Sequence, residues 1–194
     1  MSSRPEFEFT AEERHAMLAL ARSAILGALA GHACNMPARQ CACFSLRRGV
    51  FVTIYVDGDL RGCIGVIEGR ETLGQSIAHC SESAAFRDPR FAALRADEVA
   101  GLAIEISILS ELFPLDPEKI EIGKHGLFIR TAQRQGLLLP QVAVEHRLSR
   151  TQFLEETCHK AGLPRDAWRG AETQLFGFTC EIFQENGSAS AAVE

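Results

Sequence analysis

A cation, a thiol and two glycines lie close together in the segment Arg61-Gly62-Cys63-Ile64-Gly65. A cysteine thiolate is a nucleophile, which a neighbouring cation favours and a neighbouring base can generate. Glycine inside a strand marks a bulge or a place where another group approaches the backbone closely. Strand alternation puts Arg61, Cys63 and Gly65 on one face, unless a glycine bulge intervenes. The segment is therefore the first candidate for a reactive site.

His125 is the candidate base for Cys63. It lies in a glycine-flanked turn, from which a side chain can point into a cleft. If the backbone amides around Gly62 and Gly65 are not used in a sheet, they would stabilise an oxyanion. In this hypothesis Cys63 is a catalytic nucleophile, His125 is its base, and the amides around Gly62 and Gly65 stabilise the oxyanion.

Arg87 and Asp88 form a charged helix exit that could orient a substrate, or could orient each other. A purely structural alternative is equally concrete. In it Cys63 is buried under the sheet, Arg61 is paired with Asp88, and the glycines serve only close packing. The sequence leaves both interpretations open.

Residues 32–43 contain four potential soft metal ligands, namely His32, Cys34, Cys41 and Cys43. Thiolates and imidazole suit a tetrahedral zinc site. The spacing matches no common zinc-finger or zinc-ribbon pattern, however. The sequence therefore favours incidental loop and core thiols over a metal site.

Composition restricts the class of protein. The chain has 194 residues, 46% hydrophobic and 23% charged, which is ordinary for a globular protein. Its net charge of −5 and 7% aromatic content argue against a nucleic-acid partner. No apolar run approaches the length of a membrane span, and no signal-peptide pattern follows Met1. Seven cysteines without framework spacing predict reduced thiols in a cytoplasmic protein.

Capping-box patterns predict three helices, beginning after Thr10, Thr72 and Ser149. Strands are predicted on both sides of the Asp57-Gly58 turn and over residues 101–110, where Glu105 and Ser107 face away from the isoleucines. Further expected elements are a second hairpin at residues 127–140 and a last strand at about 173–184, with Phe176, Phe178, Cys180 and Ile182 facing inward. Helices and strands do not alternate strictly, which favours an α+β fold with a mixed, largely antiparallel sheet and flanking helices.

Five segments together resemble the signature of the AMMECR1 domain, and they occur in the order of that family. They are Leu60-Arg61-Gly62-Cys63-Ile64-Gly65, Ala85-Phe86-Arg87-Asp88-Pro89-Arg90-Phe91, Lys124-His125-Gly126-Leu127, Leu138-Leu139-Pro140-Gln141-Val142-Ala143 and Cys158-His159-Lys160-Ala161-Gly162-Leu163-Pro164. The resemblance implies two unequal lobes with a cleft between them and the cysteine motif near that cleft. It places the domain at 9–184, after an extension at 1–8. The small and polar residues at 185–194 are expected to form a disordered tail.

The resemblance does not supply a reaction, because the biochemical activity of the family is not established. It implies an AmmeMemoRadiSam system protein that acts beside Memo-like and radical-SAM proteins. One hypothesis is a cleft enzyme using Cys63 and His125, with no cofactor identified. The other is a non-catalytic module that binds a protein, peptide or small ligand in the same cleft. The expected ligand contacts are Arg61, Gly62, Gly65, Arg87, Asp88 and Gln141.

Overall fold

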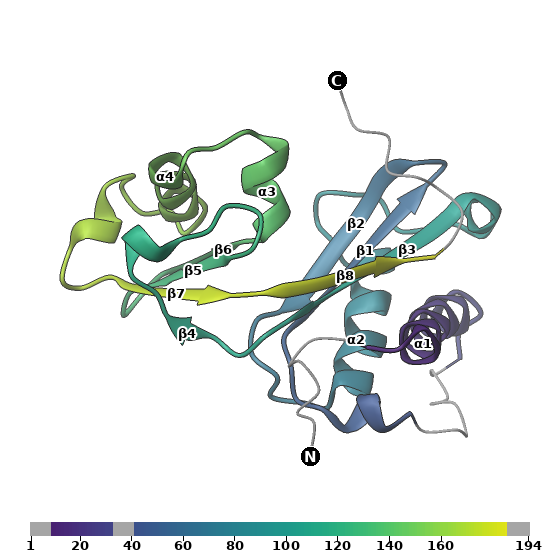
Figure 1. The fold of residues 1–194 in the computed structure, drawn as a ribbon. Helices are drawn as coiled ribbons and strands as arrows, with labels where there is room; N and C mark the ends of the chain where they lie inside the picture. Colours follow the sequence, from purple (N-terminus) through teal and green to yellow (C-terminus); the bar gives the residue numbers. More distant parts are fainter. Residues whose placement is uncertain (1–8, 33–40, 186–194) are drawn as a thin grey trace, which may run out of the picture. The chain divides into compact units, whose positions relative to one another are not determined.

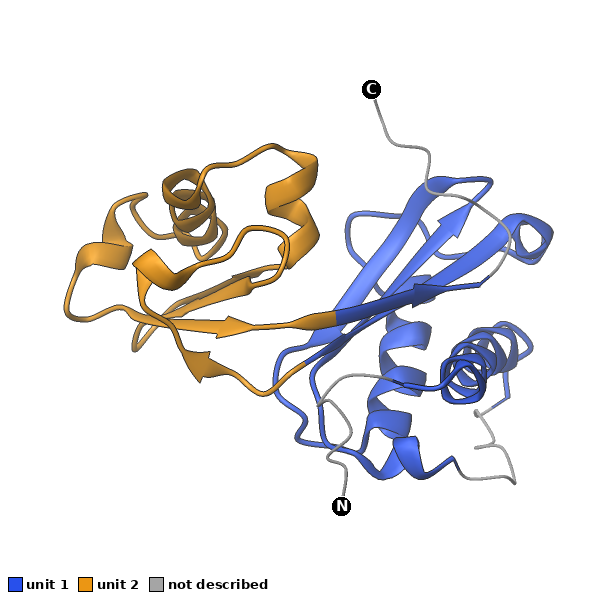
Figure 2. Ribbon diagram, in the orientation of Figure 1, with its two compact units in different colours: residues 1–109, 181–194 blue, residues 110–180 orange. Residues whose placement is uncertain are grey.

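The computed structural model describes residues 9–32 and 41–185, and the chain divides into two compact units (Figures 1 and 2). Unit 1 comprises Met1–Leu109 and Glu181–Glu194, and unit 2 comprises Ser110–Cys180. Each unit has its own four-stranded sheet with helices against it. The α+β prediction is confirmed, with two antiparallel sheets in place of the single sheet expected from the sequence.

The sheet of unit 1 has the strand order β2-β1-β3-β8. Its strands are β1 (Val50–Val56), β2 (Asp59–Val66), β3 (Leu102–Leu109) and β8 (Cys180–Gln184). The helical elements are α1 (Ala11–Leu29), α2 (Leu73–Phe86) and the short 3-10 helices η1 (Ala42–Ser45) and η2 (Ala96–Gly101). The antiparallel pairs β1–β2 and β1–β3 put β1 inside the sheet and leave β2 at its edge.

The β1–β2 turn has the conformation that its sequence predicts. Asp57 and Gly58 have φ angles of 52° and 91°, which suits the Asp-Gly dipeptide of a tight hairpin. The register then shifts by one residue, because Tyr55 pairs with Leu60 while Ile54 pairs with Gly62. Arg61 is the extra residue of this β-bulge. Strand alternation is therefore interrupted directly before Cys63.

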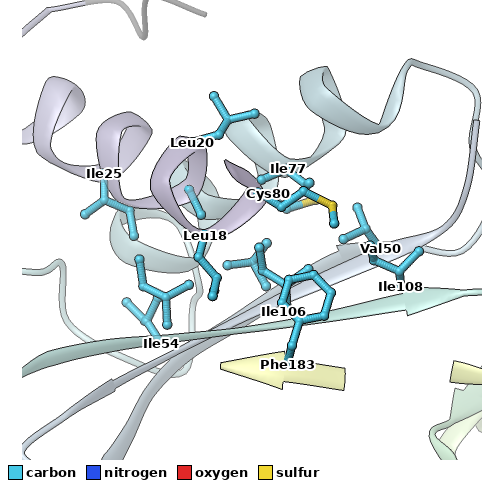
Figure 3. Packing of buried hydrophobic residues seen from close by; sticks show 14 of the residues in the cluster. Leu18, Leu20, Ile25, Val50, Ile54, Ile77, Cys80, Ile106, Ile108 and Phe183 are labelled. Atoms are coloured by element: carbon cyan, nitrogen blue, oxygen red, sulfur yellow. The ribbon is translucent and has the colours of Figure 1, made fainter. Parts of the chain in front are cut away.

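Helices α1 and α2 cover one face of this sheet (Figure 3). The core between them is made of fully buried side chains from all three elements, including Met17, Ile25, Ile77, Val52, Ile54, Ile104 and Ile106. Both helices begin with complete capping boxes, Thr10 with Glu13 and Thr72 with Gln75, as predicted. Because residues 52, 54, 104 and 106 face the helices, residues 53 and 105 face the opposite side of the sheet.

Unit 2 has a second sheet with the strand order β4-β7-β5-β6. The strands are β4 (Phe113–Pro114), β5 (Gly126–Arg130), β6 (Gln135–Leu138) and β7 (Gln174–Phe178), and the helical elements are η3 (Pro117–Lys119), α3 (Pro140–Glu145), α4 (Arg150–Lys160) and η4 (Ala167–Arg169). A separate core forms around Leu127, Phe153 and Leu154. The predicted capping box of Ser149 with Gln152 starts α4.

The prediction of a single last strand at residues 173–184 is wrong in one respect. It is two strands in two sheets, β7 and β8, interrupted at Thr179, whose N–H and C=O are bonded to Ser110. The interruption changes which residues face the core. Phe183 is buried at 8% exposure, whereas Ile182, expected to face inward, is 39% exposed.

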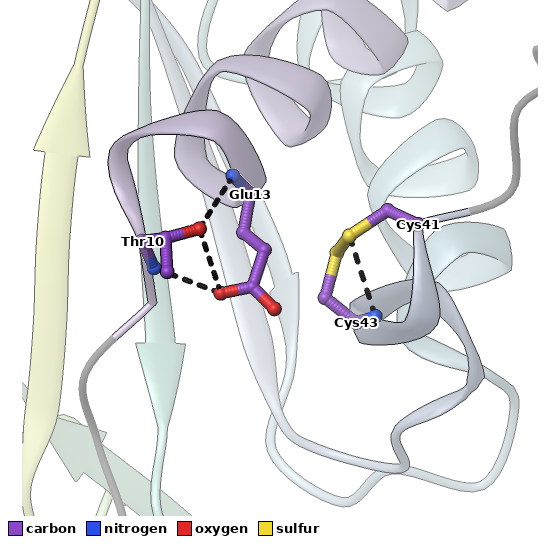
Figure 4. The surroundings of a disulfide bond; sticks show 4 residues. All are labelled: Thr10, Glu13, Cys41 and Cys43. Atoms are coloured by element: carbon purple, nitrogen blue, oxygen red, sulfur yellow. Dashed lines mark hydrogen bonds between the residues drawn. A yellow bond between two sulfur atoms is a disulfide. The ribbon is translucent and has the colours of Figure 1, made fainter.

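The expectation of reduced thiols is wrong for two of the seven cysteines. Cys41 and Cys43 form a disulfide with a Cα–Cα distance of 5.2 Å (Figure 4). Cys63, Cys80, Cys158 and Cys180 are not disulfide-bonded, and Cys34 lies outside the described residues. Within the described ranges, no helix combines the length and hydropathy that a membrane span requires.

Candidate functional site

The turn that follows α2 bonds both backbone groups of Cys63, its N–H and its carbonyl. The Cys63 N–H donates to Asp88 Oδ2 at 2.9 Å, and the Arg90 guanidinium donates to the Cys63 carbonyl at 3.1 Å. Cys63 lies on the edge strand β2, so these bonds use backbone groups that β1 does not reach. Asp88 and Arg90 thus fix the position of the cysteine from outside the sheet.

Asp88 and Arg90 also bind each other. Arg90 donates from Nε to Asp88 Oδ1 at 2.9 Å and from Nη2 to Oδ2 at 2.7 Å. The Asp88 side chain is only 1% exposed, and the hydrogen bond from Arg90 is the main reason that its pKa lies far below the usual range. The same bond, together with the charge of Asp88, raises the pKa of Arg90, and the nearby Cys63 raises it further. The Arg90 side chain is 54% exposed, so solutes can still reach its charge.

The Cys63 thiol lies on the sheet face opposite the helices. Its cross-strand partner is Thr53, which is on that face because Val52 and Ile54 are in the core. The Thr53 hydroxyl donates to Cys63 Sγ over 3.3 Å. Thr53 also pairs with Glu105 on β3. A half-buried thiol, a buried hydroxyl and a half-buried carboxylate therefore form one row across β2, β1 and β3.

The structural alternative predicted that Arg61 pairs with Asp88, and this is wrong. The Arg61 Nε donates to Glu98 Oε1 at 3.1 Å, and its guanidinium also bonds the carbonyls of Ala92 and Ala93. The reason is the bulge at Arg61, which separates this residue from the alternation of the strand. Arg61 thus anchors the segment after Arg90, and Arg90 is the cation next to Cys63.

Gly62 and Gly65 are accounted for by close packing. A Cβ on Gly62 would lie 2.0 Å from the Ala84 carbonyl oxygen of α2, and one on Gly65 would lie 2.3 Å from the Phe51 ring. Both residues are paired with β1 in the sheet. The Cys63 amide, which directly follows Gly62, already donates to Asp88. These contacts leave the Cys63 amide no role as an oxyanion donor in this arrangement.

The other two expected ligand residues, Arg87 and Gln141, have local environments of their own. Arg87 is the C-cap of α2, and its guanidinium pairs with Glu82 on the same helix. Gln141 is in α3 of unit 2, where its buried Oε1 has no hydrogen-bond partner among the described residues. Within unit 1, the members of the expected ligand set that surround Cys63 are Asp88, Gly62, Gly65 and Arg61.

His125 belongs to unit 2 and is 7% exposed. Its Nδ1 accepts the Glu121 N–H at 3.2 Å, and its ring packs edge-on against Phe113 at 5.7 Å between centroids. An accepting Nδ1 puts the proton of the neutral ring on Nε2. Burial lowers the pKa of His125, which keeps the ring neutral. In this tautomer His125 can donate from Nε2, but neither nitrogen is available to accept a proton.

The chain has relatives over most of its length. The model of the AMMECR1 family matches residues 18–183. The chain belongs to the AMMECR1 family. It is 42% identical over 174 residues to a protein of Aquifex aeolicus, covering 86% of this chain and 89% of that one, and 44% identical over 158 residues to one of Methanosarcina acetivorans, covering 78% of each.

A solved structure is similar over almost the whole chain. The crystal structure of an uncharacterised protein from Pyrococcus horikoshii has a TM-score of 0.85 and 36% sequence identity, covering 93% of this chain and 95% of that one. That protein is described as uncharacterised, so it lends no reaction to this AMMECR1-family member.

The soft-ligand hypothesis for residues 32–43 is weakened in this AMMECR1-family protein. The sulfurs of Cys41 and Cys43 are bonded to each other, His32 is exposed, and Cys34 lies outside the described residues. Among the residues that the structure describes, no group of three or more His, Cys, Asp and Glu side chains could hold a metal ion.

Sequence reasoning missed three residues around Cys63, namely Arg90, Thr53 and Glu105. Arg90 was visible only as part of a charged helix exit, since its bond to residue 63 spans 27 positions. The alternation of β3 correctly put Glu105 on the face away from the isoleucines. Only the register of β1 with both neighbours shows that this is the face of the thiol.

Proposed function

We propose that this AMMECR1-family protein is an enzyme whose nucleophile is Cys63, acting in the cytoplasm on a small electrophile that carries a negative charge. The observation that carries the proposal is the surroundings of the thiol. Asp88 accepts from the backbone N–H of Cys63, its sulfur accepts from Thr53, and the half-exposed guanidinium of Arg90 is bonded to its backbone carbonyl. A positioned thiol beside an accessible cation suits covalent catalysis on an anionic substrate.

The reaction class is addition of sulfur to an electrophilic carbonyl carbon. The thiol gives its proton to water, the sulfur forms a bond to carbon, and the electron pair of the C=O bond moves to oxygen. Arg90 supplies the positive charge that binds the anionic group of the substrate. His125 has no part in this step, because its proton-accepting nitrogen is used by Glu121.

The proposal includes pathway partners as well as a reaction. The resemblance to the AMMECR1 domain implies that Memo-like and radical-SAM proteins act in the same pathway. Purification of the tagged full chain from its native cells would test a physical association. Recovery of neither protein would remove the physical-partner part and leave the proposed chemistry of Cys63 untouched.

A non-catalytic binding module is the second candidate, and one observation favours it. The bonds from Asp88 and Arg90 to Cys63 also block the open edge of β2, and that protects a sheet without any chemistry. In that case the exposed Arg90 and the outer face of the sheet would bind an anionic ligand without turnover.

Site-resolved alkylation distinguishes the two. The full chain is treated with iodoacetamide at pH 7, and the label on each cysteine is followed by peptide mass spectrometry. We expect Cys63 to react at least tenfold faster than Cys180, which is also half-buried and not disulfide-bonded. We expect Thr53→Val to slow Cys63 and leave Cys180 unchanged. Equal rates at the two cysteines would reject the nucleophile and favour the binding module.

A further inference from the structure

The Cys41–Cys43 disulfide joins two cysteines that are separated only by Ala42. A cross-link that closes so short a loop restricts the unfolded chain little compared with a long-range disulfide. The segment is also held by other contacts. Phe44 is buried in the core of unit 1, and the Leu46 carbonyl accepts from the Leu73 N–H at 2.7 Å. The disulfide is therefore not what fixes η1 against α2.

The two sulfurs differ in their surroundings. Cys41 is half-buried, whereas Cys43 is only 3% exposed and belongs to the core of unit 1. Cys41 Sγ accepts the Cys43 N–H at 3.4 Å, as Figure 4 shows. An N–H group directed at sulfur stabilises the negative charge that this sulfur carries when the disulfide is reduced. The pair thus combines a more accessible, hydrogen-bonded sulfur with a buried one.

We propose that Cys41 and Cys43 form a redox-active pair that exchanges with low-molecular-weight cellular thiols of the glutathione class. A thiolate attacks Cys41 Sγ, the Cys41–Cys43 bond breaks, and Cys43 leaves as a thiolate that takes a proton from water. A second thiolate attacks the mixed disulfide, forms the small-molecule disulfide and releases the Cys41 thiolate. In balance, the protein disulfide is reduced to two thiols while two small thiols are oxidised to one disulfide.

The order of attack gives the proposal its test. In the reverse direction, oxidised glutathione should form its mixed disulfide on Cys41, and Cys43 should then displace the glutathione. Cys34 is near in sequence, so the trapping is done in a Cys34→Ser background. With Cys43→Ser added, we expect a stable glutathione adduct on Cys41. With Cys41→Ser added instead, we expect the adduct on Cys43 to form at least tenfold more slowly.

The controls separate this pair from the other thiols. The full chain is equilibrated in mixtures of reduced and oxidised glutathione, quenched with acid and analysed by peptide mass spectrometry. Cys34→Ser alone should show the same two-electron conversion of Cys41 and Cys43 as the unsubstituted chain. Equal trapping at the two positions, absence of the Cys41–Cys43 disulfide in oxidised glutathione, or loss of the conversion in Cys34→Ser would each overturn the proposal. None of these outcomes depends on Cys63, so the two proposals fail separately.

Discussion

Asp88 is the residue on which the geometry of Cys63 depends. Its two oxygens accept from the Cys63 N–H and from three donors of Arg90, the backbone N–H, Nε and Nη2. A buried carboxylate is tolerated because all of these bonds favour its ionised form. One side chain thus orients both the cysteine backbone and the guanidinium that we place beside the substrate.

Asp88→Asn should lower the free energy of unfolding by about 2 kcal/mol at neutral pH, since hydrogen bonds to a buried charge are lost. The folded chain lowers the pKa of Asp88, so its ionised form stabilises the fold. This stabilisation is complete above about pH 5 and falls as the pH drops below about 4, the pKa of an unfolded aspartate. Urea unfolding of both proteins across this range measures it.

The matched control is Asp97→Asn, which removes an exposed carboxylate paired with Arg95. It should change stability little at any pH, because exposed ion pairs contribute little. A difference between wild type and Asp88→Asn that persisted unchanged down to pH 2 would contradict the role of the Asp88 charge.

His125 should be neutral with its proton on Nε2, and NMR of the ring nitrogens measures this directly. The folded chain lowers its pKa below that of an unfolded histidine, about 6.5. The neutral ring therefore stabilises the fold above that pH, and the stabilisation is lost as the pH falls through the folded pKa. His125→Asn keeps an acceptor for the Glu121 N–H and should remove this pH dependence. A proton found on Nδ1 would contradict the assignment.

At the scale of elements, residues 88–98 act as a border along the edge strand β2. Asp88 and Arg90 bond Cys63, and Arg61 bonds the carbonyls of Ala92 and Ala93. An open strand edge is a template for unwanted pairing, and side chains that use its backbone groups prevent this. Residues 88–98 thus protect the edge of the sheet from unwanted pairing, and they also fix the position of Cys63.

Gly62→Ala tests how closely β2 approaches α2. The added Cβ would lie 2.0 Å from the Ala84 carbonyl oxygen, so strand and helix must separate. We expect a loss of about 1–3 kcal/mol in the free energy of unfolding, the usual cost of overpacking. Gly170→Ala is the control, since its Cβ would meet nothing closer than 3.3 Å. Equal effects of the two substitutions in urea unfolding would contradict the close packing.

Patterns of neighbouring residues predicted the helices and strands well. Contacts between residues far apart in the sequence could not be predicted. The capping boxes at Thr10, Thr72 and Ser149 depend on residues three positions apart, and all three are correct. Strand parity failed at Arg61, because one bulge residue shifts every later side chain relative to the earlier ones. The bond between Arg90 and Cys63 depends on where the turn after α2 lies against β2. Residue spacing in the sequence does not indicate that position.

At the scale of the whole molecule, the chain is two units with separate sheets and cores. Cys63, Thr53, Glu105, Asp88 and Arg90 all belong to unit 1, so the proposed chemistry needs no residue of unit 2. The Cys41–Cys43 pair is in unit 1 as well, where the contacts of η1 hold its position without the disulfide.

Reduction of the full chain should therefore leave its fold intact. The loop-entropy relation gives about 1.6 kcal/mol for closing a three-residue loop. Thermal unfolding with and without a phosphine reductant should differ by no more than about 6 °C, given roughly 2–4 °C per kcal/mol for a chain of this size. Unfolding on reduction at 25 °C would show that the disulfide is a structural cross-link.

The central claim is that Arg90 presents an anionic electrophile to Cys63, and the rates of two alkylating reagents test it most directly. Iodoacetate is charged and iodoacetamide is neutral, so the ratio of their rates at one cysteine reports the local preference for anions. We predict a higher ratio at Cys63 than at Cys180, a loss of this difference in Arg90→Gln, and its retention in Arg90→Lys and in the surface control Arg95→Gln. The same ratio at both cysteines in the wild type, or a ratio at Cys63 unchanged by Arg90→Gln, would contradict the account.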